Sequence, residues 1–294
     1  MRFRLLRVWA GILLPLCIGL LAGCSDGTSI AEKSISTGTL HVGNGQELQG
    51  LDPHLITGIS EINVLSSLFE GLVGQDPKDL SPVPAIAESW TISEDGKMYT
   101  FSIREGTTWS NGVPIRSEDF AFAYRRILTP KIAAPNAYLL YVVKGAKRYH
   151  LGETQWEDVG IQVVDDKKLI IHLQNPTPYF LKMLSHPAWF PLNETELSSH
   201  GNPFERNDAW TRAGTLVSNG PFILEDWKVN EYVSVARNTL YWDNSTNKLN
   251  QIYFYPTESK DAEERSFRGG QLHLTESLPV SKVGYYRDRN DPTL

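Results

Sequence analysis

The stretch IAESWTISEDGKMYTFSIREGTTWSNGVPIRSEDFAFAYRRIL, from Ile86 to Leu128, determines how the rest of the chain is interpreted. It predicts a hairpin, because Asp95-Gly96 is a favoured pair for a tight turn and apolar residues alternate with polar ones from Tyr99 to Arg104. A second turn, at Trp109–Pro114, leads into a helix for which Ser117 is the expected N-cap. The apolar face of this helix is formed by Phe120, Tyr124, Ile127 and Leu128.

A hairpin, a turn and a helix occur in many proteins, whereas the particular residues of this stretch point to one family. The segments AESW, DGKMYTFSIREGTTWSNGVPI and EDFAFAYRRIL resemble the extracytoplasmic solute-binding proteins of ABC importers, in particular the oligopeptide-binding branch. Further similar segments are LDPH at 51–54, FEGLV at 69–73, SNGPFIL at 218–224 and NTLYWDN at 238–244. The resemblance therefore extends over nearly all of the chain after residue 38, and in that family the opening stretch belongs to a small domain beside the ligand lobes.

The resemblance implies an α/β fold of the periplasmic-binding-protein type (type II, cluster C). Residues 39–69 and 185–294 are expected to form the first ligand lobe, and residues 70–184 an inserted small α+β domain with its own sheet. In this arrangement Leu40–Val42 should lie beside Ile252–Tyr255. The second ligand lobe of the family is absent from the sequence, so the chain is interpreted either as a fragment or as a shortened relative.

The N-terminus predicts export and a lipid anchor. Three arginines precede the apolar run Val8–Leu21, which is too short for a spanning helix but typical of a signal peptide. Leu21-Ala22-Gly23-Cys24 resembles a bacterial lipobox, so residues 1–23 are expected to be removed and Cys24 to be lipidated. Residues 24–38 are then interpreted as a flexible tether. The alternative is an ordinary signal peptide that is cleaved nearby.

The resemblance also predicts where a ligand would bind. In the family, the short extended piece between the LDP turn and the following helix runs alongside a bound peptide, and here that piece is Thr57-Gly58-Ile59. Backbone groups hold a peptide whatever its side chains, and Gly58 would permit close approach. Ser60 is the expected cap of the next helix. Trp189, near the expected hinge, is a candidate to line the cleft, with a packing role as the alternative. An ordinary loop before a helix is the alternative for 57–59.

Several classes of function find no support in the sequence. The formal net charge is -6 and no basic block occurs, which gives a nucleic-acid partner no electrostatic footprint. The seven histidines are not spaced as metal ligands, and neither a nucleophile elbow nor a phosphate-binding glycine loop is present. We therefore expect no catalytic residues, no metal and no cofactor.

The sequence is thus interpreted as a substrate-binding lipoprotein that binds oligopeptides outside the cytoplasm, in the periplasm or at the cell surface. It would deliver them to an ABC permease, whose ATPase subunits consume the ATP. The alternatives are a binder of dipeptides, nickel complexes, haem or a signalling peptide on the same scaffold, and a truncated remnant that does not transport. A cell-wall peptidase is disfavoured by the missing nucleophile. Since the second lobe is absent, peptide binding is expected to be millimolar or undetectable.

The lipid anchor can be tested at one residue. Cys24→Ser removes the thiol that would carry the lipid, so lipid labelling should be lost and the protein should move to the soluble fraction. Each buried CH₂ group contributes about 0.8 kcal/mol to membrane binding, so release should be complete. Cys17→Ser, inside the signal peptide, is the control that should stay labelled. Membrane association that persists in Cys24→Ser would contradict the lipoprotein hypothesis.

Overall fold

The computed structural model describes residues 28–288, so the expected signal peptide and Cys24 lie outside the described residues. One four-stranded antiparallel sheet contains both arms of the predicted hairpin. Its strands are β4 (Ala87–Ile92), β5 (Met98–Ile103), β6 (Ile161–Asp165) and β7 (Lys168–His172), in the order β4-β5-β7-β6. Helix α3 (Ser117–Leu128) follows β5. Its predicted apolar face is confirmed, because Phe120, Tyr124, Ile127 and Leu128 are all fully buried.

A second four-stranded sheet joins the two ends of the described chain. Its strands are β1 (Thr39–Gly43), β8 (Phe222–Lys228), β9 (Tyr232–Arg237) and β10 (Gln251–Tyr255), in the order β1-β10-β9-β8. Strand β1 pairs with β10 in parallel, and the other pairs are antiparallel. The predicted neighbours are therefore confirmed: Leu40 lies opposite Ile252 and Val42 opposite Phe254.

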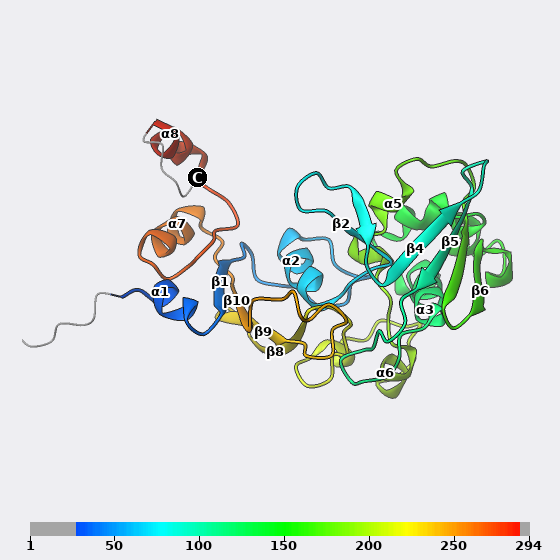
Figure 1. The fold of residues 1–294 in the computed structure, drawn as a ribbon, viewed down its shortest axis with the longest axis horizontal. Coiled ribbons are helices and arrows are strands. Elements are labelled where there is room, and N and C mark those ends of the chain that lie inside the picture. Colours follow the sequence, from blue (N-terminus) through cyan, green and yellow to red (C-terminus); the bar gives the residue numbers. More distant parts are fainter. Residues whose placement is uncertain (1–27, 289–294) are drawn as a thin grey trace, which may run out of the picture.

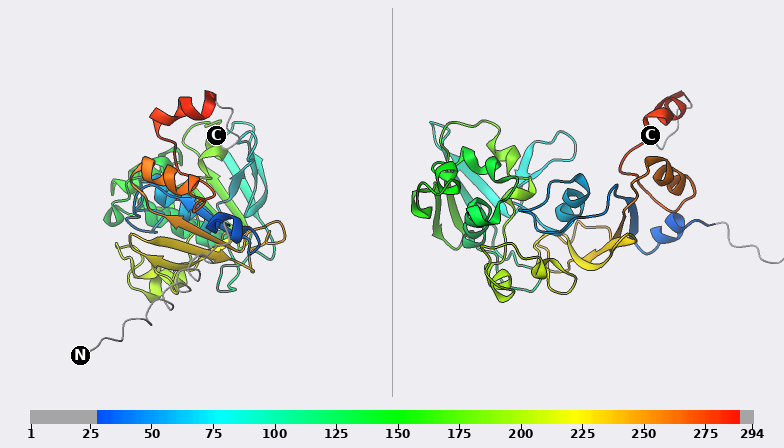
Figure 2. Two further views of the ribbon diagram at one scale, coloured as in Figure 1. Left: turned by 90° about the vertical axis from the view of Figure 1, so that its left-hand side faces the viewer. Right: turned by 180° about the vertical axis from the view of Figure 1, so that it is seen from behind.

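The molecule is elongated, and its elements are distributed along the long axis (Figure 1). The β4–β7 sheet and α3 lie at one end, α2 (Ile59–Leu68) lies in the middle, and β1, α1 (Ile30–Ile35) and α7 (Lys260–Arg268) lie toward the other end. The view from behind shows the same order (Figure 2). The other elements are β2 (Val73–Gln75), β3 (Pro82–Pro84), α4 (Ala146–His150), α5 (Phe180–Met183), α6 (Glu194–Ser199), α8 (Val280–Asp288) and the 3₁₀ segments Pro130–Ile132, Ala137–Val142, Trp156–Asp158, Pro187–Trp189 and Ala209–Thr211.

The parallel pairing of β1 with β10 brings two loops to the same edge of the sheet. The carboxyl ends of parallel strands meet at one edge, so the chain leaves β1 and β10 side by side. The backbone N–H of Asn44 donates to the carbonyl of Tyr255 at 2.8 Å, which joins the first residue after β1 to the last residue of β10. The loop that leads to α2 and the loop that leads to α7 therefore begin next to each other.

Two helix starts differ from the sequence prediction. Helix α3 begins at Ser117 with Arg116 as its N-cap, because the Ser117 hydroxyl donates to the carbonyl of Asp165 instead of capping the helix. The cap is supplied by Asp119, whose Oδ2 accepts the Arg116 N–H at 2.9 Å. Helix α2 begins one residue before the expected cap, with Gly58 as its N-cap, and Ser60 lies buried within its first turn.

The flexible tether predicted for residues 24–38 is wrong over Ile30–Ile35, which form α1. Ser29 and Glu32 form a capping box that satisfies the first N–H groups of this helix. The helix is also attached to the C-terminal part of the described chain, because the Ala31 N–H donates to the carbonyl of Gly270 at 2.9 Å. A polar composition suggested a solvated linker, but the capping residues and this distant partner favour a docked helix.

Asp119, in the first turn of α3, is a buried carboxyl group whose pKa is shifted by its surroundings. Its Oδ2 accepts the Trp109 indole N–H at 3.1 Å as well as the Arg116 N–H. Burial raises the pKa of Asp119 from 3.8 to about 6, although these hydrogen bonds oppose the rise. A carboxyl whose pKa is higher in the folded than in the unfolded state costs stability when it ionises, so stability is lost as pH rises from about 4 to about 6.

Asp119→Asn is therefore expected to stabilise the protein at neutral pH. The amide oxygen can still accept both N–H groups, while the cost of burying a charge disappears, which should raise the free energy of unfolding by about 1–2 kcal/mol. The gain should vanish near pH ~4, where the carboxyl is protonated in the folded state. Urea unfolding at the two pH values measures it, with Asp166→Asn, an exposed carboxylate, as control. A gain that is equal at both pH values would contradict the explanation.

Candidate ligand-binding site

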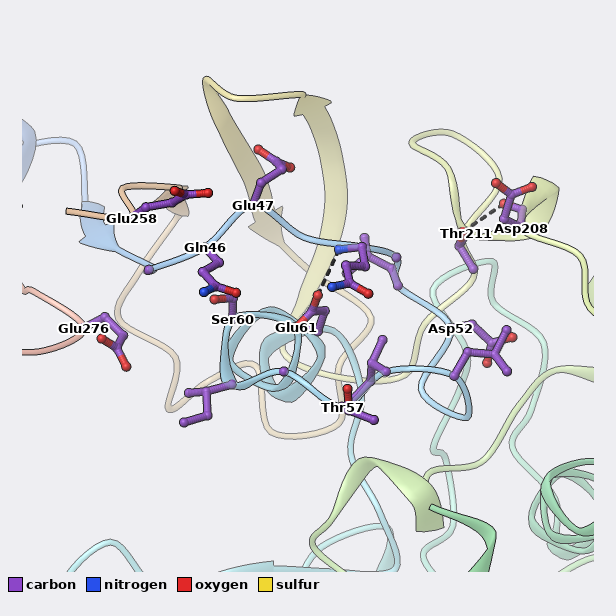
Figure 3. Close-up of a pocket in the computed structure, with 18 of the residues that line it drawn as sticks. Gln46, Glu47, Asp52, Thr57, Ser60, Glu61, Asp208, Thr211, Glu258 and Glu276 are labelled. Carbon is purple, nitrogen blue, oxygen red and sulfur yellow. Dashed lines mark hydrogen bonds between the residues drawn. The ribbon is translucent and has the colours of Figure 1, made fainter. Parts of the chain in front are cut away.

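A cavity of about 750 Å³ opens where the loops after β1 and β10 meet (Figure 3). Its size lies within the range of small-ligand pockets. Three parts of the chain line it: the loop and helix start at 45–61, the segment 206–211, and residues 257–263 with Glu276. The lining residues are Gly45, Gln46, Glu47, Gln49, Gly50, Leu51, Asp52, Leu55, Ile56, Thr57, Gly58, Ile59, Ser60, Glu61, Arg206, Asn207, Asp208, Thr211, Thr257, Glu258, Lys260, Glu263 and Glu276.

The three residues predicted to contact a ligand all line this cavity. Thr57 and Ile59 are exposed, Gly58 is half-buried, and together they form the passage from the LDPH turn into α2. Ile59 is 64% exposed, so it presents an apolar side chain at the cavity rim. The preceding residue is fixed from another part of the chain, because the Asn136 amide donates to the carbonyl of Ile56 at 3.0 Å. The geometry therefore leaves this segment accessible while its N-terminal end is anchored.

The side chain of Glu61 leaves no room for a Cβ atom at position 58, which accounts for the glycine there. A Cβ on Gly58 would lie 2.1 Å from Oε2 and 3.1 Å from the carboxyl carbon of Glu61, which folds back over the first turn of α2. Glu61 is 5% exposed, and its Oε1 accepts the Gln49 N–H at 2.9 Å. The sequence suggested that Gly58 makes room for a ligand. The structure gives a different reason, because the space over this residue is occupied by the Glu61 carboxylate.

Glu47 fixes the other end of the same loop. Its two carboxylate oxygens accept the Trp227 indole N–H at 2.9 Å and the Asn230 backbone N–H at 2.7 Å. Asn230 has a positive φ of 61° in the turn between β8 and β9, so its N–H points out of the hairpin. Glu47 and Glu61 together hold the loop 45–50 between the β8–β9 hairpin and α2. Neither residue was singled out from the sequence, because isolated acidic residues carry no motif.

The cavity has a surplus of negative charge. Its acidic side chains are Glu47, Asp52, Glu61, Asp208, Glu258, Glu263 and Glu276, and its basic ones are Arg206 and Lys260. Two of the acidic groups are paired with arginines outside the lining, Asp52 with Arg126 and Asp208 with Arg212, and the remaining five carboxylates still outnumber the two basic side chains. Arg206 donates to the carbonyls of Ile132 and Ala133, both at 2.8 Å. Burial raises the pKa of Glu263, and the nearby charge of Glu276 raises it further. The electrostatics of these walls favour a cationic or zwitterionic ligand over an anionic one.

Trp189 does not line the cavity, and the prediction for this residue is corrected. Its side chain is fully buried and packs edge-on against Tyr124 and Phe180, with ring centroids 5.2 Å and 5.5 Å apart. The Tyr124 hydroxyl also donates to the backbone carbonyl of Trp189 at 3.3 Å. The residue therefore belongs to the core between α3 and the returning chain, as large aromatic side chains commonly do.

Between residues 28 and 288, no group of three or more His, Cys, Asp and Glu side chains is arranged to hold a metal ion. Among the same residues, no helix has the length and apolar character needed to cross a membrane.

Comparison with known proteins places the chain among extracellular binding proteins. The family model described as "Bacterial extracellular solute-binding proteins, family 5 Middle" matches residues 81–293. The periplasmic oligopeptide-binding protein OppA of Escherichia coli strain K12 is 36% identical over 279 residues, covering 93% of this chain and 49% of OppA. The dipeptide-binding protein DppE of Bacillus subtilis strain 168 is 33% identical, covering 92% of this chain and 50% of DppE.

Solved structures agree with the sequence matches. Haemophilus influenzae OppA, in complex with the peptide RPPGFSPFR, superposes with a TM-score of 0.81 at 32% identity, covering 86% of this chain and 49% of that protein. The murein tripeptide-binding protein MppA of Escherichia coli gives a TM-score of 0.80 at 30% identity, with 86% and 48% covered. The fold is therefore the α/β periplasmic-binding-protein fold, and the chain spans about half the length of these relatives.

The protein is thus a binding protein of the periplasmic type by fold. More narrowly, the chain belongs to family 5 of the bacterial extracellular solute-binding proteins. This confirms the resemblance drawn from the sequence. It also agrees with the expectation that the chain is not an enzyme, because the family consists of solute-binding proteins.

The contact between Gly58 and Glu61 can be tested by a double-mutant cycle. Gly58→Ala should displace the Glu61 carboxylate and break its bond to Gln49, lowering the free energy of unfolding by about 1–3 kcal/mol. In a Glu61→Ala background the same change should cost much less, because its collision partner is gone. Gly50→Ala, in the same loop with open space around it, is the matched control. Equal costs of Gly58→Ala in both backgrounds, measured by urea unfolding, would show that Glu61 is not the cause.

Proposed function

We propose that this chain is a peptide-binding component of an ABC importer and that the cavity beside Thr57-Gly58-Ile59 is where the peptide binds. The single observation that carries the proposal is that these three residues, selected from the sequence, line the cavity formed where the loops after β1 and β10 meet. Their segment lies outside every strand of the described sheets. The Gly58 carbonyl accepts the Ile62 N–H at 3.2 Å and Ile59 opens α2, so Thr57 is the residue of the three whose backbone is best placed to pair with a peptide main chain. The relatives named for oligopeptides and dipeptides support the same class of ligand.

The charge of the cavity narrows the proposal to peptides that carry positive charge. Glu258 and Glu276 are exposed acidic side chains on one part of the wall, and Asp208, which forms an exposed ion pair with Arg212, is an exposed acidic side chain on another. A free peptide amino group, or a lysine or arginine side chain, would be attracted to these carboxylates from water. At an exposed site each such contact contributes about 1 kcal/mol, so charge adjusts affinity and does not create it.

The wider setting is part of the same proposal. Residues 39–69 and 185–294 are proposed to act as a ligand lobe and residues 70–184 as an inserted domain. The protein is proposed to be a lipoprotein outside the cytoplasm, anchored through Cys24, that passes its ligand to a permease with ATPase subunits. The periplasmic location in the names of several relatives supports export.

Titration of isotope-labelled protein with tripeptides tests the ligand class, because nuclear magnetic resonance detects binding up to millimolar dissociation constants. Trilysine should shift the amide signals of residues 57–59, and it should bind about fivefold more tightly than triglutamate, a difference that shrinks with added salt. Glu276→Gln should reduce this preference, whereas Glu94→Gln, in the β4–β5 turn, should not. If no peptide shifts these signals, the proposed function is wrong. Binding without a charge preference would refute only the electrostatic part.

A further inference from the structure

A buried arginine contacts the segment that leads into the candidate site. Arg126 of α3 donates to both carboxylate oxygens of Asp52, at 3.0 Å from Nη1 and 2.6 Å from Nη2, and Nη1 also lies 2.9 Å from Nδ1 of His54. The side chains of Arg126 and Asp52 are 1% and 6% exposed. The guanidinium therefore holds the turn Asp52-Pro53-His54, four residues before Gly58, from two sides.

The same guanidinium also contacts residues on either side of the segment 206–208, which lines the cavity. Its Nε–H donates to the carbonyl of Pro203 at 2.8 Å, and its Cζ lies 5.8 Å from the centroid of the Trp210 ring. Pro203 and Trp210 flank the segment 206–209, part of which lines the cavity. One side chain of the small domain thus connects Asp52 and His54, in the 45–61 part of the chain that lines the cavity (the first wall), to residues that flank the lining segment 206–208 (the second wall).

Two neighbouring side chains also form hydrogen bonds between the cavity lining and the region after α3. Arg206, on the second wall, donates to the carbonyls of Ile132 and Ala133. Asn136 donates to the carbonyl of Ile56 on the first wall. The residues 126–136, which include the end of α3 and the turn after it, therefore attach both cavity walls at several points.

We propose that Arg126 is a positioning residue for ligand binding, which fixes the separation of the two cavity walls by holding Asp52 and His54 on one side and Pro203 on the other. Its effect on ligand affinity rests on the proposed function, whereas its effect on the shape of the cavity does not. The inserted small domain then acts as the frame of the site, although none of its residues lines the cavity.

The chemistry of the pair argues for a geometric role. Replacing a buried ion pair by apolar residues of similar volume is often neutral for stability, so stability alone is a weak reason for such a pair. Burial on its own would raise the pKa of Asp52, but the charge and hydrogen bonds of Arg126 outweigh it and hold the pKa below its usual value. Burial and then the charge of Arg126 lower the pKa of His54 to about 3, so His54 is neutral and accepts from Arg126. Only a planar guanidinium can satisfy Asp52, His54 and Pro203 together.

The test measures the wall separation directly. Spin labels at Thr57→Cys and Asp208→Cys, in a chain whose two native cysteines are replaced by serine, report the distance between the walls. The distance distribution should be narrow in this parent. It should widen in the variant Asp52→Leu with Arg126→Met, which removes both charges without leaving one unpaired. It should also widen in Arg126→Lys, which keeps the charge but loses the planar fork.

The control is Arg148→Met, an arginine of the small domain whose ion pair with Glu153 is exposed. It should leave the distribution narrow. A folded Asp52→Leu/Arg126→Met variant with an unchanged narrow distribution overturns the proposal. If that variant does not fold, Arg126→Lys decides in the same way: a wider distribution supports the positioning role, and an unchanged one overturns it.

Measuring trilysine affinity in the same variants distinguishes a failure of this proposal from a failure of the proposed function. In the chain without labels, trilysine binding should weaken about tenfold in the variants that widen the distribution, because a site that is no longer preorganised must be ordered on binding. If the parent chain binds no peptide, the proposed function fails while the distance measurement still decides the role of Arg126. If the walls separate but trilysine affinity is unchanged, Arg126 is structural only and the positioning role in binding is refuted.

Discussion

The parallel pairing of β1 with β10 is the constraint on which the rest of the arrangement depends. It joins residues at 39–43 to residues at 251–255, and it places the loops that leave both strands at one edge of the sheet. A ligand cavity at the carboxyl ends of parallel strands is a common outcome of α/β topology. Here that edge supplies two of the three cavity walls, so the location of the site follows from the direction of one strand pair.

The two sheets are joined by buried polar groups as well as by apolar packing. Arg126 is one such connection, and Glu70, which follows the end of α2, is another. The Glu70 carboxylate accepts from the Tyr241 hydroxyl at 2.6 Å and the Trp242 indole at 2.7 Å, and burial raises its pKa. Because unpaired buried polar groups are costly, each connection favours a single relative placement of the elements it joins.

Sequence reasoning succeeded where the signal was local or carried by a whole segment. The β4–β5 hairpin followed from Asp95-Gly96, whose glycine adopts a φ of 67°. The segments shared with the family also pointed to residues 57–59, which line the cavity, while their contact with a ligand stays a prediction. It failed where the decisive partner was distant. The burial of Trp189 depends on Tyr124 of α3, and the cavity wall at 206–211 has no motif. For α1 a local signal did exist, since Ser29 and Glu32 have capping-box spacing, but the polar composition around them was given more weight.

The strand order also determines the sequence in which the molecule can assemble. The β4–β7 sheet is built mostly from neighbouring segments, whereas β1 has to wait for residues 251–255 and close a loop of roughly two hundred residues. Long-range pairing of this kind is slow. We infer that β1 stays unpaired while the β4–β7 sheet already forms. Pulse-labelling hydrogen exchange would contradict this order if the amides of β1 were protected before those of β5. Until β10 arrives, β1 is an unpaired strand, and unpaired strands of this kind promote aggregation.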